Sequence, residues 1–170
     1  MRYVIDACNF IFTYSPLEEA QERHGFQSAR AMLVRMLSRF AHAEGLDEVV
    51  AVFDGSEKGA HRPRTQREAA GKVVLIYADP RTNADNFIIE LVEDAPRPGE
   101  ITVVSNDKFI VRHVQKASAH TLSCGAFLRK MRKSVEHADD PLQGEDPRKF
   151  NGLSPREVEE WAKIMGLEDE

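Results

Sequence analysis

Short, strongly apolar segments alternate along the chain with longer segments in which apolar residues recur about every 3.6 positions. The longer segments predict helices from Ser28 to Gly45, from about residue 84 to 93, after Asp107 and from about residue 125 to 136. The short segments have the length and β-branched content of buried strands, and they predict strands at residues 2–6, 48–54, 72–77, 101–105 and 120–122. This alternation favours right-handed βαβ crossovers, so we expect an α/β fold with a parallel sheet covered on both faces.

Other parts of the chain lack either periodicity. Residues 10–27 are polar and contain a proline and a glycine, so we expect a long connection with one helical turn. Residues 1–136 then form the main domain, and residues 137–153, rich in Asp, Pro and Gly, form a linker. A capping box with proline at the first helical position predicts a C-terminal helix, with an acidic tail, at residues 154–170.

The composition is that of an ordinary globular protein, and it bears on where in the cell the protein is expected. The chain has 170 residues, of which 42% are hydrophobic and 30% charged, and no apolar run approaches the roughly 20 residues that span a membrane. It has only two cysteines, outside any CxxC pair, and no secretory signal pattern, so we expect a cytoplasmic protein without a disulfide framework.

The net charge of −5 is unevenly distributed. Residues 137–170 contain ten acidic and four basic residues, which leaves 18 acidic and 19 basic residues in the remaining 136. The main domain is therefore close to neutral, and the overall acidity does not exclude a nucleic-acid partner.

Aspartates follow three of the predicted strands and begin the helix after a fourth. Asp6, Asp54 and Asp107 lie at carboxyl ends of strands, and Asp85 lies in the first turn of the helix after residues 72–77. The carboxyl ends of parallel strands meet at one edge of a sheet, where ligands bind in open α/β proteins. Four carboxylates there would repel one another unless a cation shared them, and oxygen ligands suit Mg²⁺ or Mn²⁺. We therefore predict that all four aspartates form a divalent-metal site.

Such a site can position water and stabilise charge on a phosphodiester during hydrolysis. Asn9 could orient that water or bind a phosphate oxygen, and Ser105 and Asn106 could add neutral hydrogen bonds to substrate at the same edge. The alternative is that each aspartate is a helix cap or a turn residue, the usual role of a single aspartate after a strand. Four acids in register on one edge favour the shared site.

Basic residues gather in the segment that follows Asp54 at the same edge. We predict that this segment contacts the phosphate backbone of a substrate through Lys58, Arg62, Arg64 and Arg67. Residues 129–133 hold four more cations, for which a solvated helix face is an equally good interpretation.

Five motifs together resemble those of one protein family. They are VIDACN at 4–9, VFDG at 52–55, TNADNFIIELV at 82–92, VVSNDKFI at 103–110 and GLSPREVEEWAKIMG at 152–166. Their order and content are similar to those of NYN-domain proteins of the YacP-like group, in the PIN-like nuclease superfamily. Two departures, Ala7 for a common glycine and Ser-Asn-Asp at 105–107 for Thr-Ser-Asp, keep the carboxylates and so concern loop detail more than activity.

The resemblance implies a three-layer α/β/α PIN-like fold and metal-dependent endoribonuclease activity. It implies Mg²⁺ or Mn²⁺ bound by Asp6, Asp54, Asp85 and Asp107, with Asn9 as a helper. It also implies RNA as the substrate, with a role in RNA turnover and, for some members, on ribosomes. A monomer and a homodimer are both compatible with the sequence.

Two other functions remain open. A PIN-like module that binds RNA or the ribosome without catalysis would keep the basic segments and could dispense with the acids. A phosphohydrolase for small phosphate esters would be expected to show a DxD pattern at the first strand, but Cys8 stands two residues after Asp6.

Overall fold

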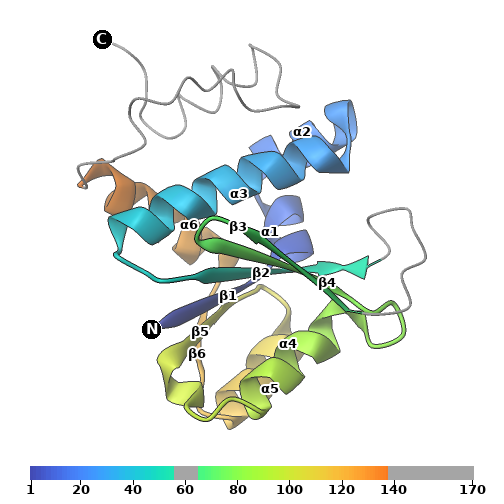
Figure 1. Ribbon diagram of the computed structural model, residues 1–170, viewed down its shortest axis with the longest axis vertical. Helices are drawn as coiled ribbons and strands as arrows, with labels where there is room; N and C mark the ends of the chain where they lie inside the picture. Colours follow the sequence, from blue (N-terminus) through green and yellow to red (C-terminus); the bar gives the residue numbers. More distant parts are fainter. Residues whose placement is uncertain (56–64, 138–170) are drawn as a thin grey trace.

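A mostly parallel sheet forms the middle layer of the protein (Figure 1). The computed structural model describes residues 1–55 and 65–137, and in that part of the chain the sheet has six strands in the order β3-β4-β2-β1-β5-β6. Only β3 runs antiparallel to its neighbour. The strands are β1 (Arg2–Asp6), β2 (Val49–Asp54), β3 (Gln66–Ala70), β4 (Val73–Ala78), β5 (Ile101–Val104) and β6 (His120–Leu122). The predicted α/β class is confirmed.

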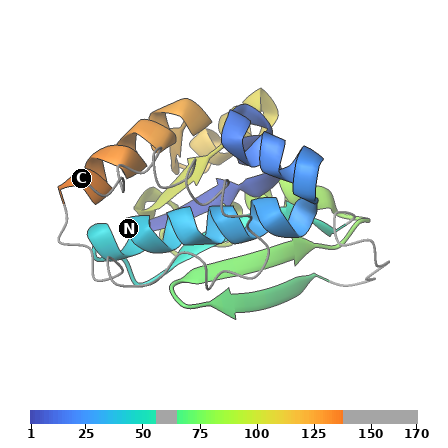
Figure 2. The ribbon, with the colours of Figure 1, turned by 90° about the horizontal axis from the view of Figure 1, so that it is seen from above.

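Helices cover both faces of this sheet, which gives the expected three layers (Figures 1 and 2). One face carries α1 (Ala7–Thr13), α3 (Phe26–Ala43) and α6 (Cys124–Glu136), with α2 (Ser15–His24) packed on α3. The other face carries α4 (Asn83–Glu93) and α5 (Lys108–Lys116), and a short 3-10 helix, η2 (Pro98–Glu100), leads into β5.

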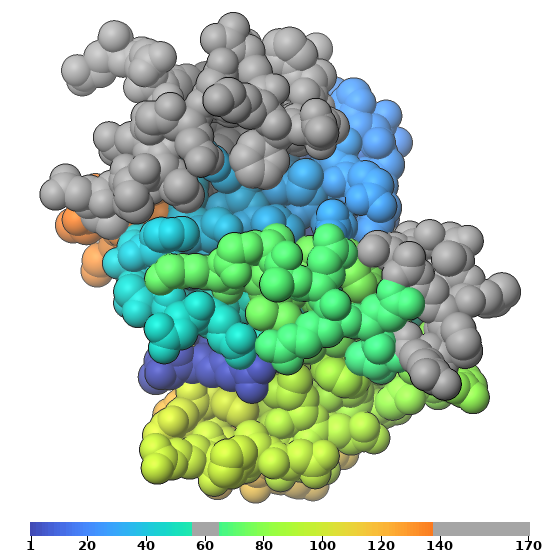
Figure 3. All heavy atoms as spheres, viewed as in Figure 1, coloured from blue at the N-terminus to red at the C-terminus, as the bar shows by residue number. Residues whose placement is uncertain are grey.

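The core is divided between the two faces by the alternation of side chains along each strand. In β1, Tyr3 and Ile5 pack beneath α1, α3 and α6, whereas Val4 packs against the layer of α4 and α5. All three are buried, because a central parallel strand is covered on both sides. In the space-filling view, β1 is visible only as a dark-blue band between the two helical layers (Figure 3).

The expectation of a long connection at residues 10–27 was wrong. This stretch forms most of α1 and all of α2, because Phe10 and Ile11 in α1 and Leu17 in α2 are buried in the core. Pro16 is tolerated in the first turn of α2. Gly25, with φ 87°, then separates α2 from α3, which begins at Phe26 and so two residues before the predicted cap, Ser28.

No strand was predicted between Asp54 and residue 72, but the last part of this basic segment is β3. The strand QREAA is mostly exposed and pairs only with β4 at the edge of the sheet. It lacks the apolar residues that identify a strand in a sequence, and a charged edge strand is a usual protection against unwanted strand pairing.

The predicted linker at 137–153 and the C-terminal helix at 154–170 lie outside the described residues, except for His137, so the domain division remains a prediction. Within the described residues, none of the helices combines the length and the hydropathy of a membrane span.

Phe127 in α6 joins several elements of the core. Its ring centroid lies 5.0 Å from that of Phe40, 5.7 Å from that of Tyr3 and 6.0 Å from that of Phe10, and its side chain is fully buried. Phe127 thus connects α6 to α3, β1 and α1, the element that begins at Asp6.

We expect Phe127→Ala to lower the free energy of unfolding by about 3–5 kcal/mol, because it leaves a cavity among rings that cannot close in. Urea denaturation measures the change. The control is Phe12→Ala, whose side chain is 60% exposed and whose loss should cost less than about 1 kcal/mol. Equal losses for the two variants would contradict this account of the core.

Candidate active site

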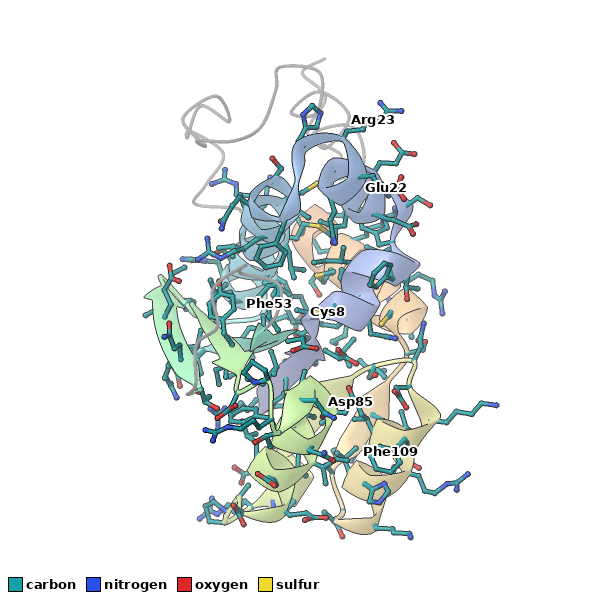
Figure 4. The ribbon with its side chains drawn as sticks, turned by 90° about the vertical axis from the view of Figure 1, so that its right-hand side faces the viewer. Cys8, Glu22, Arg23, Phe53, Asp85 and Phe109 are labelled. Carbon is teal, nitrogen blue, oxygen red and sulfur yellow. The ribbon has the colours of Figure 1, made fainter. Side chains whose placement is uncertain are left out.

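The carboxyl ends of β1 and β5 meet where the strand order reverses. The chain leaves β1 toward β2 on one side and leaves β5 toward β6 on the other, and such a reversal opens a crevice at the carboxyl edge of a sheet. Asp6 is the last residue of β1, and Ser105 directly follows β5. Figure 4 looks onto this edge and shows Cys8 and Asp85 on it.

Ser105 connects two of the predicted acids through its buried hydroxyl. Its Oγ donates to Asp6 Oδ2 at 2.9 Å and accepts from the backbone N–H of Asp107 at 3.0 Å. Both acids also begin helices: Asp6 accepts from Asn9 N at 3.5 Å at the start of α1, and Asp107 accepts from Phe109 N at 2.8 Å at the start of α5. The predicted alternative, that these aspartates are helix caps, is therefore correct for two of them and does not exclude a second role.

Burial dominates the electrostatics of Asp6. Its side chain is only 4% exposed, and this desolvation raises its pKa to about 6, although the hydrogen bonds from Ser105 and Asn9 oppose the shift. The negative charges of Asp85 and Asp107 raise the pKa further. A carboxylate held under such conditions favours the approach of a proton or of a cation.

Asp85 lies in the first turn of α4 and is half-buried. Burial raises its pKa first, and the charges of Asp107 and Asp54 add to the effect. Asp54, at the end of β2, is half-buried as well. The structure thus brings all four predicted acids to one edge, close enough for their charges to interact.

Gly55 determines how β2 ends after Asp54. A Cβ atom at this position would lie 2.1 Å from the carbonyl oxygen of Ala78, the residue that pairs with Asp54 in β4. Only glycine permits this close approach of the two strands. The Asp-Gly pair, which resembles an ordinary turn in the sequence, therefore also positions a site acid.

Asn9 belongs to a hydrogen-bonded network that crosses the crevice. Its Oδ1 accepts from Asn106 N at 2.8 Å and from Cys124 Sγ at 3.2 Å. Asn106 in turn donates through Nδ2 to Thr13 Oγ1 at 3.2 Å and accepts at Oδ1 from Cys124 N at 2.9 Å. Burial raises the pKa of the Cys124 thiol to about 11, which keeps it protonated as a donor. The network fixes the starts of α1, α5 and α6 relative to one another.

Two of the predicted substrate-binding residues already form hydrogen bonds within the protein. Ser105 is 2% exposed, and the side-chain amide of Asn106 has protein partners at both of its ends. Contact of either residue with substrate remains a prediction. Sequence analysis did not identify Thr13 and Cys124 as parts of the site, because no spacing pattern links residues so far apart in the chain.

Of the predicted basic contacts, Lys58, Arg62 and Arg64 lie outside the described residues. Arg67, in β3, directs its Nη2 to within 3.5 Å of Glu48 Oε2. Glu48 precedes β2 at the opposite, amino edge of the sheet, so this guanidinium points away from the four acids. Its contact with substrate remains a prediction.

The donor set suits a hydrated divalent ion better than a fully enclosed one. Across residues 1–55 and 65–137, no group of three or more His, Cys, Asp or Glu side chains is arranged to hold a metal ion. Mg²⁺ usually keeps several waters and binds through one or two carboxylates together with substrate phosphates. Neighbouring carboxylates with raised pKa values fit such an ion, since it would relieve their repulsion.

Comparison with solved structures agrees with this architecture. The crystal structure of a mutant of Rae1 (YacP) from Bacillus subtilis, in which leucine replaces a tryptophan, is similar with a TM-score of 0.64 and 21% identity, over 96% of this chain and 92% of that one. A second crystal structure of Rae1 (YacP) from the same organism has a TM-score of 0.64 and 18% identity, over 80% of this chain and 76% of that one. No curated protein matches the sequence.

The layered α/β fold is shared with the two Rae1 structures. The chain belongs to the family of the YacP-like NYN domain, a PIN-like nuclease family, whose model matches residues 3–166. The resemblance seen in the motifs is thereby confirmed.

The buried Asp6 should make stability depend on pH in the absence of metal. Its pKa rises from 3.8 in the unfolded chain to about 6 in the folded protein, so the folded state binds the proton more tightly. Stability therefore falls as pH rises from about 4 to 6, and a cost of about 1–3 kcal/mol persists at higher pH. We expect Asp6→Asn to raise the free energy of unfolding by this amount at pH 7.5 in EDTA, and to change it little near pH 4.

Urea denaturation at the two pH values tests this expectation, with Asp94→Asn as the control because Asp94 is an exposed aspartate at the far end of α4. An Asp6→Asn protein that is less stable than the wild type at pH 7.5 would contradict this expectation, because it would show that the ionised Asp6 does not lower the free energy of unfolding.

Proposed function

We propose that this protein is a metal-dependent endoribonuclease that hydrolyses phosphodiester bonds in RNA. The observation that carries the proposal is the meeting of Asp6, Asp54, Asp85 and Asp107 at one edge of the sheet, where the charges of neighbouring acids raise the pKa values of Asp6 and Asp85. Membership of a nuclease-type family supports the reaction class. Structural cap residues alone would not need to be brought within electrostatic range of one another.

The four acids have different positions relative to solvent, which suggests a division of roles. Asp54, Asp85 and Asp107 are half-buried, so one or two of them would hold Mg²⁺ or Mn²⁺ directly and the others through its waters, whereas the deeply buried Asp6 adds negative charge behind them. When bound, the ion supplies positive charge that activates water and offsets the charge of the phosphodiester.

Neutral groups around the acids would orient the reacting parts. Ser105 holds the Asp6 carboxylate in one orientation through its hydroxyl. Asn9 uses Oδ1 within the protein, and its amide nitrogen has no partner among the described residues, so this nitrogen can donate to a phosphate oxygen. The basic segment after Asp54 would hold the RNA backbone, and RNA on the ribosome is a further candidate substrate.

A second function is favoured by one observation. Because no three ligating side chains are gathered among the described residues, the protein could hold RNA or a ribosome at this edge without cleaving it. This binding module would use the same surface and would be indifferent to metal removal.

Cleavage of a mixed RNA pool in Mn²⁺ or Mg²⁺, with EDTA as the blank, distinguishes the two functions. We expect metal-dependent cuts, and we expect Asp85→Asn to reduce them about 100-fold or more, since loss of a partner outside the ligand shell alone costs about 10- to 100-fold. Asp94→Asn, on the same helix but exposed at its far end, should cleave like the wild type.

Full activity in Asp85→Asn would contradict the proposed site. RNA that is retained but never cut, by the wild type in either metal and with or without added ribosomes, would support the binding module instead.

A further inference from the structure

Helix α5, which Asp107 begins, has two sharply different faces. Ile110 and Val114 are fully buried against the sheet. The opposite side exposes Lys108, Phe109, Arg112 and Lys116, and the helix contains no acidic residue. In a chain with a net charge of −5, a helix that presents three cations and no acid stands out. We call these four exposed residues the α5 face.

The three cations of the α5 face are available to a ligand. Within the described residues, no ion pair joins Lys108, Arg112 or Lys116 to a carboxylate. The cations stand at intervals of four residues and thus follow one side of the helix, about 5–6 Å apart along its axis. Such a row of cations is suited to a polyanion that runs along the helix.

An aromatic ring is set among these charges. Phe109 is 51% exposed, and the ring of His113 lies against it with a centroid distance of 4.3 Å and an interplanar angle of 48°. Figure 4 labels Phe109 on α5 and Asp85 on α4, the helix beside it. Because Phe109 donates its N–H to Asp107 Oδ1, the ring is tied to a site acid two residues away.

The other strongly exposed aromatic ring belongs to α1, which covers the opposite face of the sheet from α5. Among the described residues, Phe12 and Phe109 are the only aromatic side chains with more than half of their surface exposed. Phe12 belongs to α1, the helix that Asp6 begins, and its neighbour Thr13 is hydrogen-bonded to Asn106 beside α5. The two rings therefore stand on the two helices that the site acids Asp6 and Asp107 start, on opposite faces of the sheet.

From this juxtaposition we infer that Phe12, Phe109 and the cations of the α5 face bind single-stranded RNA on both sides of the scissile bond by base stacking and phosphate contact. The inference rests on the proposed function for its substrate class and adds the residues that would hold the strand. Exposed rings interleaved with cations are the usual means of holding unpaired bases. A duplex hides the faces of its bases, so these rings could not reach them.

Binding to a single-stranded oligoribonucleotide that contains 2-aminopurine tests the inference in the full-length protein, in EDTA so that cleavage does not intervene. The fluorescence of 2-aminopurine is quenched on stacking. We expect quenching by the wild type, its loss in Phe109→Leu with at least about fivefold weaker binding, and its retention in Phe109→Tyr. Leucine keeps the apolar bulk and removes only the ring, so the comparison isolates stacking. Phe12→Leu should behave like Phe109→Leu.

The cations have a separate readout in the dependence of binding on salt. Arg112→Gln should reduce the slope of log K against log salt by about 0.7. Arg97→Gln is the matched control, because Arg97 is 77% exposed but precedes β5 at the opposite edge of the sheet. It should leave the slope unchanged.

The outcomes separate this inference from the proposed function. Quenching by the wild type that depends on Phe109 supports the inference even if no metal produces cleavage. Equal binding and quenching by wild type and Phe109→Leu would overturn it, even where the wild type cleaves RNA. Binding of the same sequence as a duplex with equal affinity would also overturn it, as would no binding of the oligonucleotide at low salt, which would leave the α5 face to a protein partner.

Discussion

The hydroxyl of Ser105 links the two strands on which the candidate site depends. It accepts a hydrogen bond from the backbone of Asp107 in the same turn and donates one to the side chain of Asp6, so the ends of β1 and β5 cannot move apart without breaking the bond to Asp6. Serine is well suited to this position, since a hydroxyl can donate and accept at once and fits in a space without solvent. A threonine, which the resemblance implied at this position, would also supply a hydroxyl, so this departure in the motif keeps the group that makes both hydrogen bonds.

The site is held together against its own electrostatics. Asp6 is buried at a cost, and its acidic neighbours increase that cost rather than relieving it. The surrounding structure supplies the compensation: the aromatic core under α1 and α6, the network of Asn9, Asn106 and Cys124, and the close contact of Gly55 with Ala78. An arrangement that opposes local stability is typical of residues retained for function, and neutralisation of the acids by a cation or a substituted amide would remove the strain.

The sequence was a good guide to the sheet and to the location of the acids, because both depend on local patterns. Buried parallel strands are continuous apolar segments, and an aspartate at the end of each must fall on a common edge once the strands are parallel. The errors occurred where the local pattern was weak: α1 is only seven residues long, α2 carries few apolar residues, and β3 is a polar edge strand. The connections of Thr13 and Cys124 to the site could not be predicted, because they depend on how α1 and α6 pack and not on any spacing in the chain.

Under the proposed function, the start of α5 would combine catalysis and substrate binding within one helical turn. Asp107 caps α5 by accepting a hydrogen bond from the backbone N–H of Phe109, and its negative charge raises the pKa of Asp85. Since a helix is rigid over one turn, the distance from the acid to the Cβ of Phe109 cannot change unless the cap is lost. A nucleotide stacked on Phe109 would therefore have a fixed distance to the acidic edge. On this view α5 positions the substrate and the sheet positions the acids. The Asp107 cap belongs to both, because it begins α5 and lies at the carboxyl edge of the sheet.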